Sequence, residues 1–251
     1  MRQVIALLLA GGSGSRIGSE IPKQYIQVEG RMIIERCIER LLACGWIDGI
    51  WIVAEEAWRE DIRRLRYEYN NDEPVGCRDR RLPDDEGIRS GRDWLLGFSD
   101  PGENRAYSIY HGLQDLSKRY PEDTIVLIHD AARPMVSREI LEQCVEGCET
   151  YDGVMPVLPM KDTVYYASDD GTEVEQLLDR SRVYAGQAPE SYRLGKYLAA
   201  YERLSETELL ALHGSTEPAV MAGMRIKLIP GEEENYKITT PADLERYRHQ
   251  V

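Results

Sequence analysis

Apolar residues along this chain fall into short runs that alternate with stretches of helical spacing. Five of the runs have the length and composition of β-strands, and the first and third show no polar alternation, as expected of strands buried on both faces. They are residues 4–10 (VIALLLA), 50–54 (IWIVA), 124–130 (TIVLIHD), 153–158 (GVMPVL) and 225–229 (RIKLI).

Between these runs, apolar residues recur at the spacing of amphipathic helices. The patterns predict helices around 33–42 and 140–148, the latter with Ser137 as its N-cap, and further helices over 191–204 and 241–250. Alternating strands and helices predict an α/β fold, here a three-layer, mainly parallel, twisted sheet. The length of 251 residues fits one such domain.

Two stretches depart from this alternation. Residues 59–93 are crowded with charged residues, which predicts a surface helix followed by a long loop. Residues 159–182 alternate polar and apolar residues around the turn sequence DDGT, which predicts a β-hairpin that projects from the sheet.

Composition narrows the partners. The net charge of −13 disfavours nucleic acid and anionic membranes as partners, so basic residues must gather locally to bind a phosphorylated ligand. No apolar stretch is long enough to span a bilayer, and the start of the chain is interpreted as a buried strand rather than a signal peptide. Five cysteines without a CxxC pair predict reduced thiols and a cytoplasmic protein.

The sequence AGGSGSRIGSEIPKQY (10–25) follows the first predicted strand. A dinucleotide fingerprint would need glycine where Ile17 stands, and no Gly-Lys-Ser/Thr of a P-loop occurs. The remaining interpretation is a Gly/Ser loop whose free N–H groups surround a triphosphate. Arg16 and Lys23 would then supply the full positive charges that backbone donors lack.

A second candidate segment, HDAARP, follows the third predicted strand. Open α/β sheets bind ligands beyond the carboxyl ends of their strands, where this segment and the Gly/Ser loop both lie. Asp130 either caps the next turn or helps to hold Mg²⁺ and a ribose. Arg133 is expected to order the turn, and His129 to be a packed core histidine.

Five sequence blocks carry a family resemblance. LLLAGGSGSRIGSEIPKQY, GENRAYSIYHGL, VLIHDAARPMV, DRSRVYAGQAPESYRL and ENYKITTPADL stand in this order along the chain. They resemble the motifs of enzymes that join CTP to a sugar-alcohol phosphate. Over its whole length the chain resembles the 2-C-methyl-D-erythritol 4-phosphate cytidylyltransferase family and its ribitol-5-phosphate relatives.

This resemblance implies a fold and a reaction. Residues 1–251 would form a single domain of Rossmann-like nucleotidyltransferase fold, and the hairpin at about 159–182 would be an arm that joins two chains in a homodimer. A phosphate oxygen of the polyol phosphate would attack the α-phosphorus of CTP and release pyrophosphate, with Mg²⁺ as cofactor. Because the nucleophile is already an anion, the reaction needs cations and positioning rather than a strong base.

The resemblance also assigns residue roles. Arg16 and Lys23 would stabilise the transition state, and Arg180 and Lys237 would hold the acceptor phosphate. Thr163 and Glu234 would contact the polyol, and Asp130 the metal. Nucleotide contacts are implied for Ala10, Gly11, Gly12, Gly14, Ser15, Gly102, Glu103, Arg105, Ser108, Asp130 and Ala131.

The departures from the family pattern cluster on the acceptor side. Ala188 and Glu190 replace the usual Thr and Gln, Glu234 replaces an Asp, and a TDEAS-like segment is unrecognisable in HGSTEPAVMAG, where Ser215 and Thr216 are candidates to compensate. The loop 78–91 resembles an insertion. The larger family, which acts on methylerythritol phosphate, gives the first acceptor, and ribitol phosphate is the alternative. A sugar-1-phosphate nucleotidyltransferase and a nucleotide-binding protein without turnover are the rival classes.

Overall fold

The first predicted strand lies at the centre of the sheet. In this computed structural model, which describes residues 2–12, 18, 21–71 and 93–251, β1 (Val4–Leu9) pairs in parallel with β6 (Ile125–Asp130) and β4 (Gly49–Val53). Strand β4 pairs in parallel with β5 (Leu95–Ser99). The carboxyl ends of all four strands therefore lie along one edge of the sheet.

The other half of the sheet is mixed. Strand β11 (Glu190–Arg193) runs antiparallel between β6 and β7 (Gly153–Pro159). Strands β10 (Tyr184–Gly186) and β12 (Ile226–Pro230) both pair with β7. Within the described residues, eight strands form this sheet in the order β10-β7-β11-β6-β1-β4-β5, with β12 beside β7. Because β7 is antiparallel to β11, its carboxyl end reaches the same edge as that of β6.

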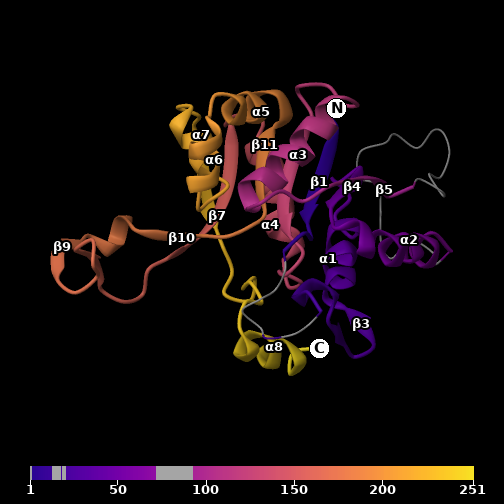
Figure 1. Cartoon of the computed structure of the whole chain (residues 1–251), viewed down its shortest axis with the longest axis horizontal. Helices are drawn as coiled ribbons and strands as arrows, with labels where there is room; N and C mark the ends of the chain where they lie inside the picture. The colour runs from indigo at the N-terminus through magenta and orange to yellow at the C-terminus, as the bar shows by residue number, and fades with distance from the viewer. Residues whose placement is uncertain (1, 13–17, 19–20, 72–92) are drawn as a thin grey trace.

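Helices cover both faces of the sheet (Figure 1). One face packs against α1 (Ile33–Leu42), α2 (Glu56–Asn71) and α4 (Arg138–Gly147), and the other against α3 (Arg105–Ser117), α5 (Leu194–Glu202), α6 (Glu206–Ala211) and α7 (Glu217–Met221). Strand β1 serves both cores, because Ala6 and Leu8 join the first and Ile5 and Leu7 the second. This confirms the predicted three-layer α/β fold.

A third, smaller core lies at the carboxyl edge. Helix α8 (Pro241–Arg248) packs Leu244 and Tyr247 against Ile33 of α1, and the hairpin β2 (Gln27–Val28) and β3 (Arg31–Met32) closes this core. Figure 1 shows α8 at the opposite end of the molecule from the N-terminus. The segment between β12 and α8 thus runs along the carboxyl edge of the sheet.

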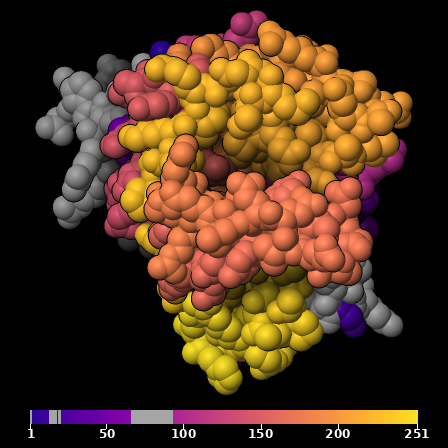
Figure 2. All heavy atoms as spheres, turned by 90° about the vertical axis from the view of Figure 1, so that its left-hand side faces the viewer, coloured from indigo at the N-terminus to yellow at the C-terminus, as the bar shows by residue number. Residues whose placement is uncertain are grey.

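The predicted hairpin is confirmed as a projecting arm. Strands β8 (Val164–Ala167) and β9 (Val174–Leu178) pair antiparallel, and the turn between them contains Gly171 at φ +71°. A 3-10 helix, Arg180–Arg182, leads back to β10. The arm leaves the body after β7 and extends to one side (Figure 1), and Figure 2 shows its side chains standing out in front of the body, above α8.

Most predicted elements are found, with one error in type and a few omissions. The helix predicted over 191–204 begins only at Leu194, since Ser191–Arg193 belong to β11. Their main chain pairs with β6 and β7, and the Ser191 hydroxyl donates to the Cys144 carbonyl (2.5 Å), so Ser191 is buried with a partner, while Arg193 is half-buried. Strands β5, β10 and β11 were not predicted. The 78–91 loop lies outside the described residues.

The helices and the cysteines bear on the predicted location of the protein. None of the helices in the described ranges combines the length and apolarity needed to cross a bilayer. Four cysteines (Cys37, Cys44, Cys144 and Cys148) are free and buried. The cytoplasmic location stays a prediction.

The close packing of β7 against a buried tyrosine gives a test of the fold. A Cβ at Gly153 would lie 2.5 Å from the Tyr192 ring, which is fully buried and stacked on Tyr197 at 3.9 Å between centroids. We expect Gly153→Ala to lower the free energy of unfolding by about 1–3 kcal/mol in urea titrations. The exposed variant Glu202→Ala should stay within about 0.5 kcal/mol of wild type. Equal stability of both variants would contradict the packing.

Candidate active site

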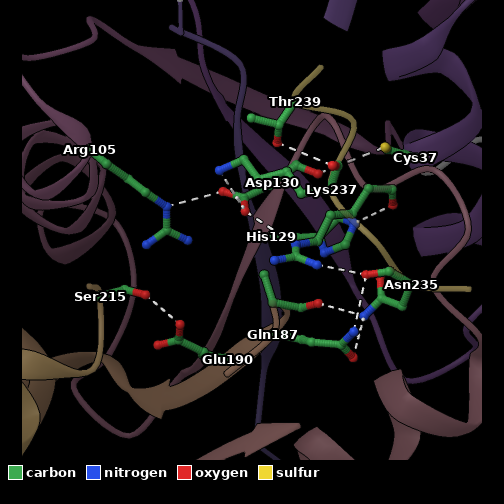
Figure 3. Close-up of polar contacts among 12 residues, drawn as sticks. Cys37, Arg105, His129, Asp130, Gln187, Glu190, Ser215, Asn235, Lys237 and Thr239 are labelled. Carbon is green, nitrogen blue, oxygen red and sulfur yellow. Dashed lines mark hydrogen bonds and ion pairs between the residues drawn. The ribbon is translucent and has the colours of Figure 1, made fainter. Parts of the chain in front are cut away.

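A buried carboxylate at the end of β6 gathers three cations. Asp130 Oδ1 accepts from Arg105 Nε at 3.1 Å, while Oδ2 lies 3.1 Å from Lys237 Nζ and 3.4 Å from Arg133 Nε. The Asp130 side chain is 8% exposed. Figure 3 shows Arg105 and Lys237 reaching it from different parts of the chain. The sheet edge therefore carries a local excess of positive charge in an acidic protein.

The charges of this group depend on each other. Burial alone would raise the pKa of Asp130, but Arg105, Lys237 and Arg133 hold it well below its usual range. Burial alone would also lower the pKa of Arg105, which Asp130 and then Glu190 raise. The carboxylate is thus ionised at neutral pH and allows three like charges to lie together.

His129 supports the turn that follows. It is fully buried, and its Nε2 lies 3.1 Å from the Arg133 carbonyl, which only accepts, so Nε2 carries the proton. Its Nδ1 is buried without a hydrogen-bond partner in the described structure. Burial lowers the pKa of His129 to about 4. His129 is therefore a neutral, packed histidine, as predicted.

The start of the Gly/Ser loop is held through its carbonyls. Gln24 Nε2 donates to the carbonyls of Ala10 (2.6 Å) and Gly12 (2.9 Å), and the Tyr25 hydroxyl donates to Ala10 (3.1 Å). A Cβ at Gly11 would lie 2.3 Å from Pro101 Cβ, so only glycine allows this approach. The structure thus brings the predicted loops at 10–12 and 101–103 together. Gln24 and Tyr25 had no predicted role, although their place in the PKQY motif was a signal.

The loop before α3 uses a predicted hydroxyl for its own structure. Ser108 Oγ accepts from the Gly102 amide at 3.0 Å and donates to the Asn104 carbonyl at 2.9 Å. Glu103 beside it is exposed, while Ala131 is buried and its amide donates to the Leu9 carbonyl. The predicted contacts of these residues to the nucleotide stay predictions.

Lys23 lies near the start of α8. Burial would raise the pKa of Asp243 at the start of α8, but hydrogen bonds from the Thr240 and Thr239 amides, together with the charge of Lys23, lower it. Lys23 is therefore close enough to the start of α8 for its charge to act on Asp243. Gly14, Ser15 and Arg16 lie outside the described residues.

The structure does not bring the arm residues to the Asp130 group of the same chain. Arg180 Nη1 donates to the Lys161 carbonyl at 2.7 Å, and both Arg180 and Thr163 are exposed on the arm. Glu234, outside the arm, accepts from Arg246 of α8 (3.1 Å) and from Gln250 (2.5 Å). The acceptor roles of these three residues stay predictions.

Ser215 and Thr216 both donate hydrogen bonds to Glu190, the residue that stands in place of the family's Gln. Its buried carboxylate accepts from both hydroxyls, at 3.0 Å from Thr216, and from the Tyr192 hydroxyl at 2.7 Å. Figure 3 shows the Ser215 contact below Arg105. A second carboxylate, which accepts three side-chain hydrogen bonds, thus lies close enough to Arg105 for its charge to act on that guanidinium.

The side chains at this edge offer few ligands for Mg²⁺. Among the described residues, no group of three or more His, Cys, Asp or Glu side chains is arranged to hold a metal. Enzymes that act on nucleotides usually bind Mg²⁺ through one or two carboxylates plus substrate phosphates and water. At this edge both oxygens of Asp130 already pair with Arg105, Lys237 and Arg133, so a metal that arrives with a triphosphate would have to share this carboxylate with them.

Comparison with known proteins identifies the family. The model of the 2-C-methyl-D-erythritol 4-phosphate cytidylyltransferase (IspD) family matches residues 4–79 and 95–249. The chain belongs to this family. The prediction from the sequence blocks is therefore confirmed, and so is that of a nucleotidyltransferase enzyme.

Curated relatives agree over the full chain. The chain is 34% identical to the 2-C-methyl-D-erythritol 4-phosphate cytidylyltransferase of Rubrobacter xylanophilus, over 97% of this chain and 93% of that protein. It is 34% identical to the bifunctional IspD/IspF enzyme of Granulibacter bethesdensis, of which it spans 55%. It is 29% identical to the ribitol-5-phosphate cytidylyltransferase of Lactiplantibacillus plantarum, over 96% of this chain and 95% of that one.

Solved structures agree with the fold. The 4-diphosphocytidyl-2C-methyl-D-erythritol synthase of Anaerococcus prevotii superposes with a TM-score of 0.74 at 22% identity, covering 99% of this chain and 98% of that one. The Francisella tularensis 2-C-methyl-D-erythritol 4-phosphate cytidylyltransferase also gives 0.74 at 22% identity, with 99% and 100% covered. The IspD fold is thus shared from end to end.

The neutral His129 gives a pH-dependent prediction. Its pKa is about 6.5 in the unfolded chain and about 4 in the folded one, so between these values only the unfolded chain binds the proton, and stability falls as the pH falls. The loss amounts to about 3 kcal/mol. We expect His129→Gln, which keeps a donor for Arg133, to lose about that much less stability than wild type between pH 7 and pH 4 in urea titrations. Parallel curves for the two proteins would contradict this.

Proposed function

We propose that this chain transfers a cytidylyl group from CTP to 2-C-methyl-D-erythritol 4-phosphate. The observation that carries the proposal is the convergence of Arg105, Arg133 and Lys237 on Asp130 at the carboxyl edge of the sheet. Membership of the cytidylyltransferase family and the names of its relatives supply the nucleotide and the acceptor.

The chemistry needs little more than charge and position. An acceptor phosphate oxygen forms a bond to the α-phosphorus of CTP while the bond to the bridging oxygen of the β-phosphate breaks, and pyrophosphate leaves with the electron pair. Three cations against one carboxylate leave a positive excess that offsets the repulsion between acceptor and triphosphate. Lys23, with Arg16, is assigned to the triphosphate side and Lys237 to the acceptor side.

A bound Mg²⁺ would neutralise part of the triphosphate charge, with Asp130 as its protein contact. The ε-N–H of Arg105 is engaged by Asp130, which fixes the plane of its guanidinium at the edge where the phosphates are expected. Gln24 and Tyr25 hold the carbonyls of the Gly/Ser loop, which favours N–H groups turned toward an anion. These residues bind and orient, and none is assigned as a general base.

The working form is proposed to be a homodimer. Four large apolar side chains of the arm, Tyr165, Tyr166, Val174 and Leu177, are more than half exposed. The arm also carries Arg180, which donates to the Lys161 carbonyl, and Thr163, and Figure 1 shows the arm extending away from the sheet. A second copy of the chain would cover the apolar residues and receive these polar ones at its acceptor site.

The activity is tested by pyrophosphate release. We expect the highest turnover with CTP and methylerythritol phosphate, and little with UTP. Preferential use of ribitol 5-phosphate would support the alternative acceptor. YAGQAPESY resembles the form of this block in ribitol-phosphate enzymes, and the Lactiplantibacillus relative is a ribitol-5-phosphate cytidylyltransferase. Absence of turnover with any polyol phosphate would leave a nucleotide-binding protein.

Removal of one cation should be costly. We expect Lys237→Ala to lower kcat/KM for the acceptor by at least about 100-fold, because the charge over Asp130 is lost. Lys227→Ala, which removes an exposed lysine on β12, should stay within about twofold of wild type. Similar kinetics for both variants would contradict the role of Lys237.

The arm can be tested by association. We expect sedimentation to give a dimer for wild type and a monomer with low turnover for the double variant Val174→Ser/Leu177→Ser, because the exposed apolar contact is removed. The pair Val220→Ser/Met221→Ser on α7, equally exposed, should stay dimeric. A dimeric arm variant with full turnover would contradict the proposal.

A further inference from the structure

Lys237 lies on a segment without regular secondary structure. Residues 231–240 run from β12 to α8, so neither a strand ladder nor a helix fixes their path. Yet the Nζ of Lys237 must lie 3.1 Å from Asp130, on another element, for the cation group to form. Contacts from outside the segment have to supply this order.

One buried side chain grips the start of the segment. Gln187 Nε2 donates to the Glu232 carbonyl at 2.8 Å, and Gln187 Oε1 accepts from the Glu232 amide at 3.1 Å, so both groups of its amide pair with one residue's main chain. Gln187 is 6% exposed, and its own amide donates to Pro156 of β7 at 2.8 Å. It therefore ties the segment to the sheet.

A second group of contacts brackets Lys237 itself. Asn235 is fully buried, and its Nδ2 donates to the Ala188 carbonyl at 2.8 Å (Figure 3). The Asn235 carbonyl accepts from Arg133 Nη1 at 2.6 Å and from Gln187 Nε2 at 3.4 Å. After Lys237, the Ile238 amide donates to the Ala132 carbonyl at 2.9 Å. Gln187 is the member of this group that touches both Glu232 and Asn235.

We propose that Gln187 is a positioning residue for the acceptor phosphate. It acts through Lys237: by holding the main chain of Glu232 and Asn235, it keeps the ammonium group over Asp130 before the acceptor binds. The hydrogen bonds of its side-chain amide go to other residues of the chain, so it is not assigned a contact to either substrate. The proposal rests on the proposed function, since it takes Lys237 as the acceptor-binding cation.

The expected consequence is specific to one substrate. Without the grip, the segment would populate conformations in which Lys237 is displaced, and apparent affinity falls in proportion to the competent fraction. The Gly/Ser loop is held by Gln24 and Tyr25 instead, so CTP binding should not depend on Gln187.

Kinetics of Gln187→Met and Gln187→Glu on the purified full chain test this. Met keeps the length without hydrogen bonds, and Glu keeps the acceptor but loses the donor. We expect KM for methylerythritol phosphate to rise about tenfold in both, with KM for CTP within about twofold of wild type. Ser191→Ala, another buried polar residue of the sheet, should lower stability without this split. Parallel rises in both KM values, or no rise, would overturn the proposal.

A double variant tests whether the effect passes through Lys237. If it does, Gln187→Met should add less than about twofold to the defect of Lys237→Ala, because the positioned group is already gone. Multiplying effects would overturn the proposal. If Gln187→Met does not fold, Gln187→Asn, which is one methylene too short to reach both partners, takes its place.

Hydrogen exchange separates this proposal from the proposed function. In Gln187→Met the amides of Glu232, Asn235 and Ile238 should exchange at least about tenfold faster than in wild type, with β1 unchanged. If the wild-type protein shows no turnover but Gln187→Met still shows this faster exchange, the proposed activity is refuted and the role of Gln187 in holding the segment stands. Unchanged exchange at these amides would refute the tether whatever the activity.

Discussion

The buried carboxylate of Asp130 is the constraint on which the site depends. Three cations from α3, from the turn after β6 and from the segment before α8 would repel one another without it, and the carboxylate would be costly to bury without them. The three cations therefore need Asp130 to lie close together, and Asp130 needs the cations to be buried. Parts of the chain more than one hundred residues apart are pinned at one point of the sheet edge by this mutual requirement.

Such a group suits a reaction between two anions. Because Asp130 cancels only part of the positive charge, the edge keeps an excess that phosphates can use, although the whole chain carries −13. The excess is fixed in place before any ligand arrives, so little reorganisation is needed when charge develops on the α-phosphorus. Acidic surroundings elsewhere keep this excess local.

Three of the four strands in the parallel half, β1, β4 and β6, could be predicted because they are apolar runs, and HDAARP could be recognised because it follows such a run. Strand β11 was missed since Glu190, Ser191 and Arg193 look exposed in sequence; they are accommodated by partners far along the chain, such as the Cys144 carbonyl. The same holds for Gln187, whose role depends on where Glu232 lies. Polar residues that are buried with distant partners leave no periodic signal.

Strand ends and polar residues with distant partners occur in different parts of the proposed site, and the departures from the family pattern fall among the latter. The proposed nucleotide side is built on strand ends, where the sheet fixes the geometry and the motifs match the family. The proposed acceptor side is built on the segment 231–240, on the residues around Glu190 and on the arm, where side-chain contacts fix the geometry. A change there, such as Ala188 or Glu190, can be accommodated by neighbouring donors without disturbing the sheet. Substitution of acceptor residues is therefore compatible with an intact cytidylyl-transfer centre.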